Sequence, residues 1–266
     1  MTKGFKLFTN GESKTYGLIG KTLKHSFSSK YFAKKFKTEK ISNCKYLHFE
    51  LEDLKEFPSV LEEYPDLIGL NVTIPYKKNI IKYLDEIDRS SRFIGAVNTI
   101  KITRKKDKIS LSGFNTDAYG FEKTFLPHLK EYHDHALVLG TGGASKAVVY
   151  VLRKNGITYK EVTRNPYKSN QIPYSFITKE ILSRYKIIIN TTPVGMYPNV
   201  NDAIDIPYHH LNEKNLLYDL VYNPEETQFL KEGKKQGATT VNGLKMFELQ
   251  AERSWKIWNK KSIFPF

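Results

Sequence analysis

Short apolar runs alternate with segments of helical spacing along most of this 266-residue chain. In the first half, the strand-like runs are TYGLIG, KYLHFEL, DLIGLNVT and VNTIKIT, and the helix-like segments between them are Ser29–Thr38, Asp53–Tyr64 and Pro75–Leu84. TRKKDK suits a hairpin turn that leads into ISLSGFNT. A second series of strands follows at HALVLG, TYKEVTR, KIIINTT, LLYDLVY and ATTVNG. This alternation predicts an α/β fold with parallel sheet.

The two series of strands are separated by an amphipathic helical segment near Tyr119–His133. The length fits one large domain or two modest ones, at roughly 100–200 residues per domain. After Gly243, the run LKMFELQAERSWKIW has apolar residues at helical spacing and predicts a C-terminal helix. The natural division of the chain therefore falls near Tyr119–His133.

Composition excludes several classes of protein. A hydrophobic content of 40% can form a sizeable core, and a single cysteine, Cys44, gives no disulfide framework. No apolar run approaches the roughly 18 residues that a membrane span needs. The opening MTKGFKLFTNGESKT lacks the apolar segment of a signal peptide. We expect a cytoplasmic protein with no membrane partner.

The net charge of +14 is spread along the chain, with only short clusters such as KYFAKKFK and RKKDK. A basic protein can bind nucleic acid or acidic small molecules. Because the sequence contains no zinc-finger spacing, no RNA-binding motif and no long basic arm, we expect neither a nucleic-acid partner nor a metal site. A monomer and a homodimer both remain open.

The second series opens with HALVLGTGGASKAVVYVL, an apolar strand, a glycine turn and a helix. Gly140, Gly142 and Gly143 form the turn, and Ser145 stands where the usual G-x-G-x-x-G motif has its third glycine. Such a turn lets the backbone approach a pyrophosphate and presents the helix N–H groups to it. The alternative is a tight turn with no ligand. The strand before it and the helix after it favour dinucleotide binding.

The next strand ends at Thr163, followed by Arg164 and, four residues later, Lys168. NAD sites usually have an acidic residue here, about 20 residues after the glycines, to bind the ribose hydroxyls. A guanidinium instead suits a 2′-phosphate, with Lys168 adding a second positive charge. Arg164 is otherwise an ordinary exposed arginine. The pattern predicts NADP as the cofactor.

The segment LNVTIPYK, Leu70 to Lys77, places a lysine just after an apolar strand. Pro75 suits the first position of a helix, where a missing N–H costs nothing. Lys77 is then expected in the first helical turn, where the macrodipole disfavours a cation. Lys77 is either an exposed helix lysine, as we expect for Lys78, or a group with a chemical role.

Polar residues also follow other strands of the first half. Ser26 and Ser28 come after YGLIG and suit either helix caps or a carboxylate site. GAVNT contains Asn98 and GFNTD contains Asp117, and both residue types favour turns. The residues alone leave these alternatives open.

Eight motifs in order give the chain a family resemblance: HSFS, NVTIPYK, GAVNT, GFNTD, LGTGGASKA, NTTPVGM, DLVYNPEET and NGLKMFELQA. In this order they resemble shikimate dehydrogenase, from about Tyr16 to Trp258. The resemblance implies a substrate-binding domain of residues 1–118 and 244–266. It also implies a Rossmann-like NADP-binding domain of residues 119–243 between these parts.

The resemblance also implies an activity, the reversible reduction of 3-dehydroshikimate to shikimate with NADPH. Its implied catalytic pair is Lys77 and Asp117. The implied substrate contacts are Ser26, Ser28, Thr73, Asn98, Asp117, Tyr222 and Gln250. The implied cofactor contacts are Gly140, Thr141, Gly142, Gly143, Ala144, Arg164, Lys168, Asn190, Thr191, Thr192, Leu220, Gly243 and Met246.

The chain departs from the family pattern at a few positions. Ser29 replaces a proline, Tyr31 stands near the place of a frequent histidine, and Thr141 replaces an alanine in the glycine turn. Two alternatives remain open: a related dehydrogenase acting on quinate with NAD, and a catalytically silent NADP-binding sensor. Arg164 argues against NAD, and the Lys77–Asp117 pair argues against a silent protein.

Overall fold

The computed structural model of the chain describes residues 13–24, 26–106 and 108–260. His25 of the HSFS motif and the two ends of the predicted substrate domain, 1–12 and 261–266, lie outside the described residues. The elements up to the end of the first sheet are β1 (Lys14–Gly20), α1 (Ser28–Thr38), β2 (Cys44–Glu50), η1 (Leu54–Glu56), α2 (Phe57–Glu63), β3 (Leu67–Val72), η2 (Asn79–Tyr83), β4 (Glu86–Ile87), α3 (Arg89–Ile94), β5 (Thr99–Lys105) and β6 (Lys108–Phe114).

The rest of the described chain begins with α4 (Asp117–Phe125) and ends with α8 (Leu244–Asn259). Between them lie η3 (Leu126–His128), β7 (His135–Leu139), α5 (Gly143–Lys154), β8 (Thr158–Val162), β9 (Gln171–Ile172), η4 (Tyr174–Phe176), α6 (Lys179–Arg184), β10 (Ile187–Asn190), η5 (Tyr208–His210), β11 (Leu216–Asp219), α7 (Gln228–Lys235) and β12 (Thr239–Val241). The strands predicted from sequence are all present. The sequence patterns did not reveal the short elements β4, α3, β9 and α6, or the helix α7.

The first sheet has six strands in the order β2-β1-β3-β5-β6-β4. Strands β1, β2 and β3 are parallel, whereas β5 pairs antiparallel with both β3 and β6. The expectation of parallel sheet is therefore wrong only for β5, because β4 and β6 also pair in parallel. The physical reason is the short turn between Lys105 and Lys108, the predicted hairpin, because neighbouring strands joined by so few residues must run antiparallel.

The second sheet is parallel throughout, in the order β12-β11-β10-β7-β8-β9. The chain starts in the middle with β7, extends to one side through β8 and β9, and then crosses over to β10 on the other side. The strand order thus reverses between β7 and β10. In open α/β sheets, ligands bind at such a switch point, outside the carboxyl ends of the strands.

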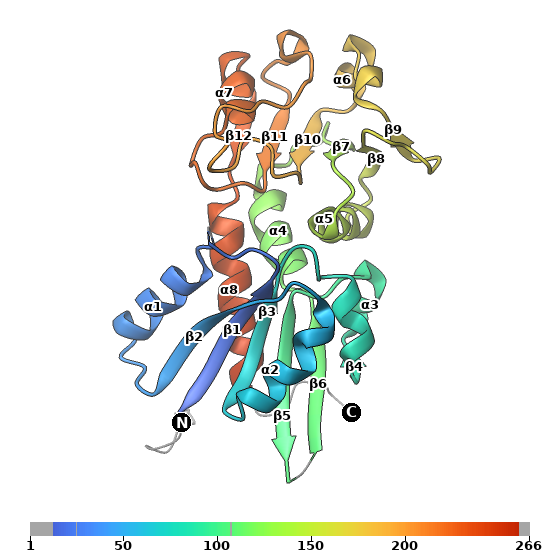
Figure 1. The fold of residues 1–266 in the computed structure, drawn as a ribbon. Coiled ribbons are helices and arrows are strands. Elements are labelled where there is room, and N and C mark those ends of the chain that lie inside the picture. Colours follow the sequence, from blue (N-terminus) through green and yellow to red (C-terminus); the bar gives the residue numbers. More distant parts are fainter. Residues whose placement is uncertain (1–12, 25, 107, 261–266) are drawn as a thin grey trace, which may run out of the picture.

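Two helices link the sheets (Figure 1). Helix α4 leaves the first sheet towards the second, and α8 returns beside it to pack on the first sheet. Trp258 of α8 donates its indole N–H to the carbonyl of Ile100 at 3.0 Å. It also lies against Gly69 so closely that a Cβ at Gly69 would stand 2.4 Å from the indole. The C-terminal helix therefore completes the core of the first sheet.

The segment from Pro75 to Leu84 differs from the expectation. Residues 75–78 form a turn, and only Asn79–Tyr83 is helical, as a 3₁₀ helix. The carbonyl of Lys77 accepts a hydrogen bond from the backbone N–H of Val97, just before β5, at 2.7 Å. This carbonyl therefore bonds outside its own segment and not within a helix. Lys77 is therefore outside any helix, and the argument from an unfavourable macrodipole does not apply to it.

The predicted helix at Asp53–Tyr64 is present as the pair η1 and α2, and the C-terminal helix is present as α8. The amphipathic segment near Tyr119–His133 contains α4 and η3. Over the part of the chain that the structure describes, no helix is long and apolar enough to cross a membrane.

Candidate active site

Lys77 and Asp117 form an ion pair at the carboxyl edge of the first sheet. The lysine Nζ lies 2.6 Å from Oδ2 of Asp117, and the two side chains are only 14% and 9% exposed. Asp117 is the first residue of α4, where the helix macrodipole favours a carboxylate. The helix terminus therefore supports the anion of the pair, and the lysine is held by that anion.

Asn98 connects Asp117 to the C-terminal helix. Its Nδ2 donates to Oδ1 of Asp117 at 2.8 Å and approaches Oε1 of Gln250 at 3.4 Å. These contacts span 19 and 152 residues of sequence. The predicted residues Lys77, Asp117, Asn98 and Gln250 therefore form one hydrogen-bonded group, and Asn98 is buried rather than a surface turn former.

Ser26 and Ser28 lie at the start of α1. Ser26 Oγ accepts the backbone N–H of Ser28 at 3.2 Å, which is a local capping contact. The side chain of Ser28 bonds the phenol of Tyr46, whose pKa is raised by burial. Tyr222 lies close enough to Tyr46 to raise that pKa further. The structure thus places both Ser28 and Tyr222 near Tyr46.

Tyr222 is held between two aromatic rings. It stacks on Phe247 with ring centroids 4.8 Å apart and meets Phe27 edge-on at 5.5 Å. Burial raises the pKa of Tyr222 to about 12, so the phenol is neutral at physiological pH and can donate a hydrogen bond. Thr73 follows the last residue of β3 and lies beside Gly20, and its backbone N–H donates to the carbonyl of Ile19 at 2.8 Å.

The glycine turn after β7 lies at the switch point of the second sheet. Gly140 has a φ of +103°, and a Cβ there would stand 2.9 Å from Thr191 Oγ1 and from Thr192 Cγ2. Ser145 is fully buried, and its hydroxyl donates to the carbonyl of Gly142 at 2.8 Å. A small residue that bonds its own turn thus takes the place of the third glycine.

Asn190, Leu220 and Gly243, three further residues predicted to contact the cofactor, lie at or just after the ends of β10, β11 and β12. A Cβ at Gly243 would stand 2.1 Å from the carbonyl oxygen of Leu220, so only glycine fits there. Asn190 is fully buried, and its side chain bonds Asp219 at 2.9 Å and the hydroxyl of Thr192 at 2.7 Å. The buried side chain of Asn190 therefore holds Thr192 and Asp219 in place at the ends of the strands.

Comparisons with known proteins identify the family. Residues 18–100 match the shikimate dehydrogenase substrate binding domain. The shikimate dehydrogenase (NADP(+)) of Methanococcus maripaludis is 39% identical over 277 aligned residues, covering 96% of both chains. That of Clostridium beijerinckii is 41% identical and covers 92% of both chains. The chain belongs to the shikimate dehydrogenase family.

Solved structures of the shikimate dehydrogenase family share the fold. The Thermus thermophilus enzyme in complex with NADP(H) and shikimate has a TM-score of 0.78 at 28% identity, with 92% of this chain and 93% of that chain covered. Quinate dehydrogenase from Corynebacterium glutamicum in complex with NAD has a TM-score of 0.80 at 25% identity, with 94% of each chain covered. The chain thus has a substrate-binding unit and a Rossmann unit of the shikimate dehydrogenase type.

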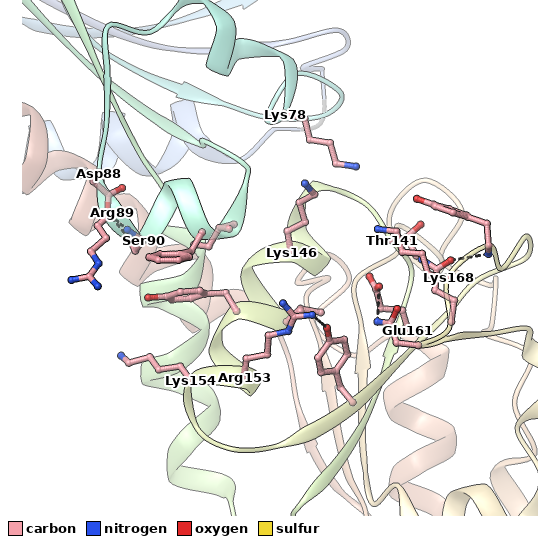
Figure 2. A pocket seen from close by; sticks show the side chains of 18 residues that line it. Lys78, Asp88, Arg89, Ser90, Thr141, Lys146, Arg153, Lys154, Glu161 and Lys168 are labelled. Carbon is pink, nitrogen blue, oxygen red and sulfur yellow. Dashed lines mark hydrogen bonds between the residues drawn. The ribbon is translucent and has the colours of Figure 1, made fainter.

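A cavity of about 1010 Å³ lies beside the glycine turn of this family member (Figure 2). Thr141 and Lys168 are among its lining residues, as are Lys78 and Lys146. Arg164 is exposed outside this lining, near Tyr174. The cavity therefore brings together only part of the predicted phosphate site.

The sequence patterns did not single out Lys146. Its Nζ donates to the carbonyl of Gly95 at 3.2 Å, so this bond joins α5 to the end of α3. Burial lowers its pKa, and the nearby positive charges of Lys78 and Lys168 lower it further. The positive charges of Lys78, Lys146 and Lys168 lie near one another and form a region where an anion is stabilised. The sequence feature that could have indicated Lys146 is its position three residues after Gly143, the last glycine of the turn.

Proposed function

We propose that the chain catalyses the reversible, NADPH-dependent reduction of 3-dehydroshikimate to shikimate. The observation that carries the proposal is the position of the Lys77–Asp117 pair beside the glycine turn. A Cβ at Gly143 would stand 3.3 Å from Cβ of Lys77, so the side chain of the lysine packs against the first residue of α5. The proposed proton donor thus lies in contact with the proposed nucleotide-binding turn.

The residues at the turn fit a dinucleotide. A Cβ at Gly142 would meet nothing within 4 Å, which leaves the N-terminus of the 12-residue helix α5 open to a phosphate group. Because Gly140 and Gly243 have no Cβ, the chain packs closely against Thr191 and Thr192 at the first glycine and against Leu220 at the second. When bound, NADPH supplies the hydride. We place Arg164 and Lys168 at its 2′-phosphate, and Ala144, Leu220 and Met246 along its length.

On the substrate side, we assign the carboxylate to Ser26 and Ser28, with the neutral phenol of Tyr222 as a further donor. The ring hydroxyls are assigned to Thr73, Asn98, Asp117 and Gln250, of which the last three already form one group. Positive charge and hydrogen-bond donors hold the substrate from several sides, so its carbonyl has a fixed place next to Lys77.

Lys77 then handles the charge that develops on the substrate oxygen. As hydride reaches the carbonyl carbon, the carbonyl oxygen becomes an alkoxide that needs one proton. The Lys77 ammonium stabilises this oxyanion and donates the proton, and in the oxidation direction it takes the proton back. Asp117 holds the ammonium in place through the 2.6 Å contact.

We also assign residues 1–118 and 244–266 to the substrate-binding domain and residues 119–243 to the NADP-binding domain. The strand orders of the two sheets and the return of α8 to the first sheet support this division. The scattered lysines and the single cysteine support a cytoplasmic protein without a nucleic-acid partner.

The test crosses two substrates with two cofactors. Purified protein is assayed for formation of reduced nicotinamide with shikimate or quinate and with NADP or NAD. The proposal predicts the highest kcat/KM for shikimate with NADP. A preference for quinate with NAD would assign the chain to the other activity in its family. No turnover with any pair, despite NADP binding, would indicate a silent binding protein.

A further inference from the structure

Three buried hydroxyl groups lie behind the Lys77–Asp117 pair. They belong to Thr99 at the start of β5, Thr116 just before α4 and Ser254 in α8. The oxygen of Thr99 lies 2.8 Å from that of Ser254 and 3.2 Å from that of Thr116, and Thr116 and Ser254 are 3.2 Å apart. All three residues are at most 1% exposed. We refer to these three residues as the hydroxyl triangle.

Thr116 and Thr99 together orient the Asn98 amide. Nδ2 of Asn98 donates to the hydroxyl of Thr116 at 3.0 Å. The backbone N–H of Thr116, which can only donate, lies 2.7 Å from Oδ1 of Asn98. The hydroxyl of Thr99 lies 3.1 Å from the same oxygen. Because Oδ1 is held by these donors, Nδ2 must face Asp117, to which it donates at 2.8 Å.

Asn71 of β3 extends the network across the hydroxyl triangle. Its Nδ2 lies 3.0 Å from the oxygen of Ser254 and 3.3 Å from that of Thr99. Its Oδ1 accepts the phenol of Tyr46 at 2.9 Å, and Tyr46 also bonds Ser28. Hydrogen bonds thus connect the proposed carboxylate site with the proposed catalytic pair through the core.

Ser254 is the member of the hydroxyl triangle that comes from a distant part of the chain. Its side chain also donates to the carbonyl of Gln250 at 2.9 Å, within α8. A buried hydroxyl costs free energy unless it is hydrogen-bonded, and an alanine would suffice if this position only had to fill space. Across the described residues no buried side-chain N or O atom lacks a partner, and fully satisfied networks of this kind hold side chains rigidly.

We propose that Ser254 is a positioning residue for the reaction: through Thr116 and Asn98 it holds the carboxylate of Asp117, and therefore the ammonium of Lys77, in the reactive geometry. This inference rests on the proposed function. If Ser254 has this role, α8 helps to set the geometry of the catalytic pair in addition to supplying Gln250.

The first test is the variant Ser254→Ala, assayed with shikimate and NADP. We expect kcat to fall about 10-fold, since misplacement by an ångström at a reacting group can cost on the order of 100-fold. KM should change much less, because Ser26, Ser28 and Tyr222 still hold the substrate. Thr124→Val is the matched control. Thr124 has a buried hydroxyl that bonds the carbonyl of Gly120, one turn earlier in α4, at 2.9 Å.

The control should lose thermal stability as Ser254→Ala does but keep its kcat. If Ser254→Ala keeps the wild-type kcat and only its melting temperature falls, Ser254 is structural and the inference is wrong. An equal fall of kcat in both variants would also overturn it, because any buried hydroxyl would then have the same effect.

The second test asks whether Ser254 acts through Asn98. In an Asn98→Ala background, Ser254→Ala should have little further effect on kcat, since the amide it orients is gone. Full additivity of the two losses would contradict the proposed route. Wild-type protein is assayed first: an inactive wild type would reject the proposed function, whereas an active wild type with an unchanged Ser254→Ala rejects only this inference.

Discussion

The side chain of Lys77 packs directly against Gly143, so that a Cβ at position 143 would stand 3.3 Å from Cβ and 3.4 Å from Cδ of the lysine. Lys77 follows β3 of the first sheet and Gly143 follows β7 of the second, and the two residues are 66 positions apart in the chain. Gly143 begins α5, where the phosphates of a dinucleotide are expected, and Lys77 pairs with Asp117. This contact sets the distance between the glycine turn and the proposed proton donor.

The contact predicts the effect of Gly143→Ala. The helix start accepts alanine, which has the higher helix propensity, so the melting temperature should be unchanged or slightly raised. The added methyl displaces Lys77 by a few tenths of an ångström, and we expect kcat to fall about 10-fold. Kinetics and thermal unfolding of the same preparation measure both effects.

Gly142→Ala is the comparison for this variant, because a Cβ there meets nothing within 4 Å. Any loss in Gly142→Ala should appear in the KM for NADP and not in kcat. If Gly143→Ala showed wild-type kcat, the position of Lys77 would not depend on the glycine turn.

A second prediction concerns selection of the cofactor. Arg164→Ala and Lys168→Ala should each weaken NADP binding while NAD binding stays nearly the same. Hydrogen bonds to charged groups contribute about 1.5–3 kcal/mol, which corresponds to about 10- to 150-fold in affinity. Titration of each variant with both cofactors measures the difference, and Lys179→Ala, an exposed change on α6, is the control.

Equal losses for NADP and NAD would place the residue at the shared part of the dinucleotide. Because Lys168 lines the cavity beside Thr141 and Arg164 does not, the two variants also distinguish which charge faces the 2′-phosphate. An effect confined to Lys168→Ala would remove Arg164 from the site.

A third prediction concerns stability and pH. Asp219 is fully buried, and burial raises its pKa to about 6 although Thr227, Val221 and Asn190 all donate to it. Between about pH 4 and pH 6 the folded protein holds a proton that the unfolded chain has released, so this group makes stability fall as pH rises through that range. The full effect is about 3 kcal/mol, at 1.36 kcal/mol per pKa unit.

Asp219→Asn cannot titrate and should lack this contribution. The difference in free energy of unfolding between wild type and Asp219→Asn, measured with urea, should move against the wild type as pH rises from about 4 to about 7. Parallel pH profiles for the two proteins would show that Asp219 has the same pKa in both the folded and the unfolded state.

Much of the fold was predictable because apolar runs and the glycine turn are local signals. Strand β7, Gly140 and the start of α5 follow from one continuous stretch of sequence. The turn at Lys77 was not predictable, because the hydrogen bond that shapes it comes from Val97. A local pattern such as Pro75 suggested a helix, and a contact from 20 residues away prevented it.

The residues of the candidate site were likewise predictable where a local motif marks them and not where contacts between distant segments place them. Resemblance in the motifs pointed to Lys77, Asp117 and Asn98, and the structure brings these side chains together. The hydroxyl triangle was not predicted, because Thr99 and Ser254 are 155 residues apart and neither carries a charge. Lys146 went unnoticed among many other lysines, since only its position beside Gly95 distinguishes it.

The most direct test of the central claim is the kcat of Lys77→Met with shikimate and NADP. Methionine keeps most of the length that packs against Gly143 but removes the ammonium. We predict a fall in kcat of about 10²- to 10⁴-fold, the usual range for a general acid–base group, with a much smaller change in KM. Lys82→Met, in η2, should keep the wild-type kcat. A Lys77→Met enzyme with normal kcat and a raised KM would contradict the account, because Lys77 would then bind the substrate without taking part in the reaction.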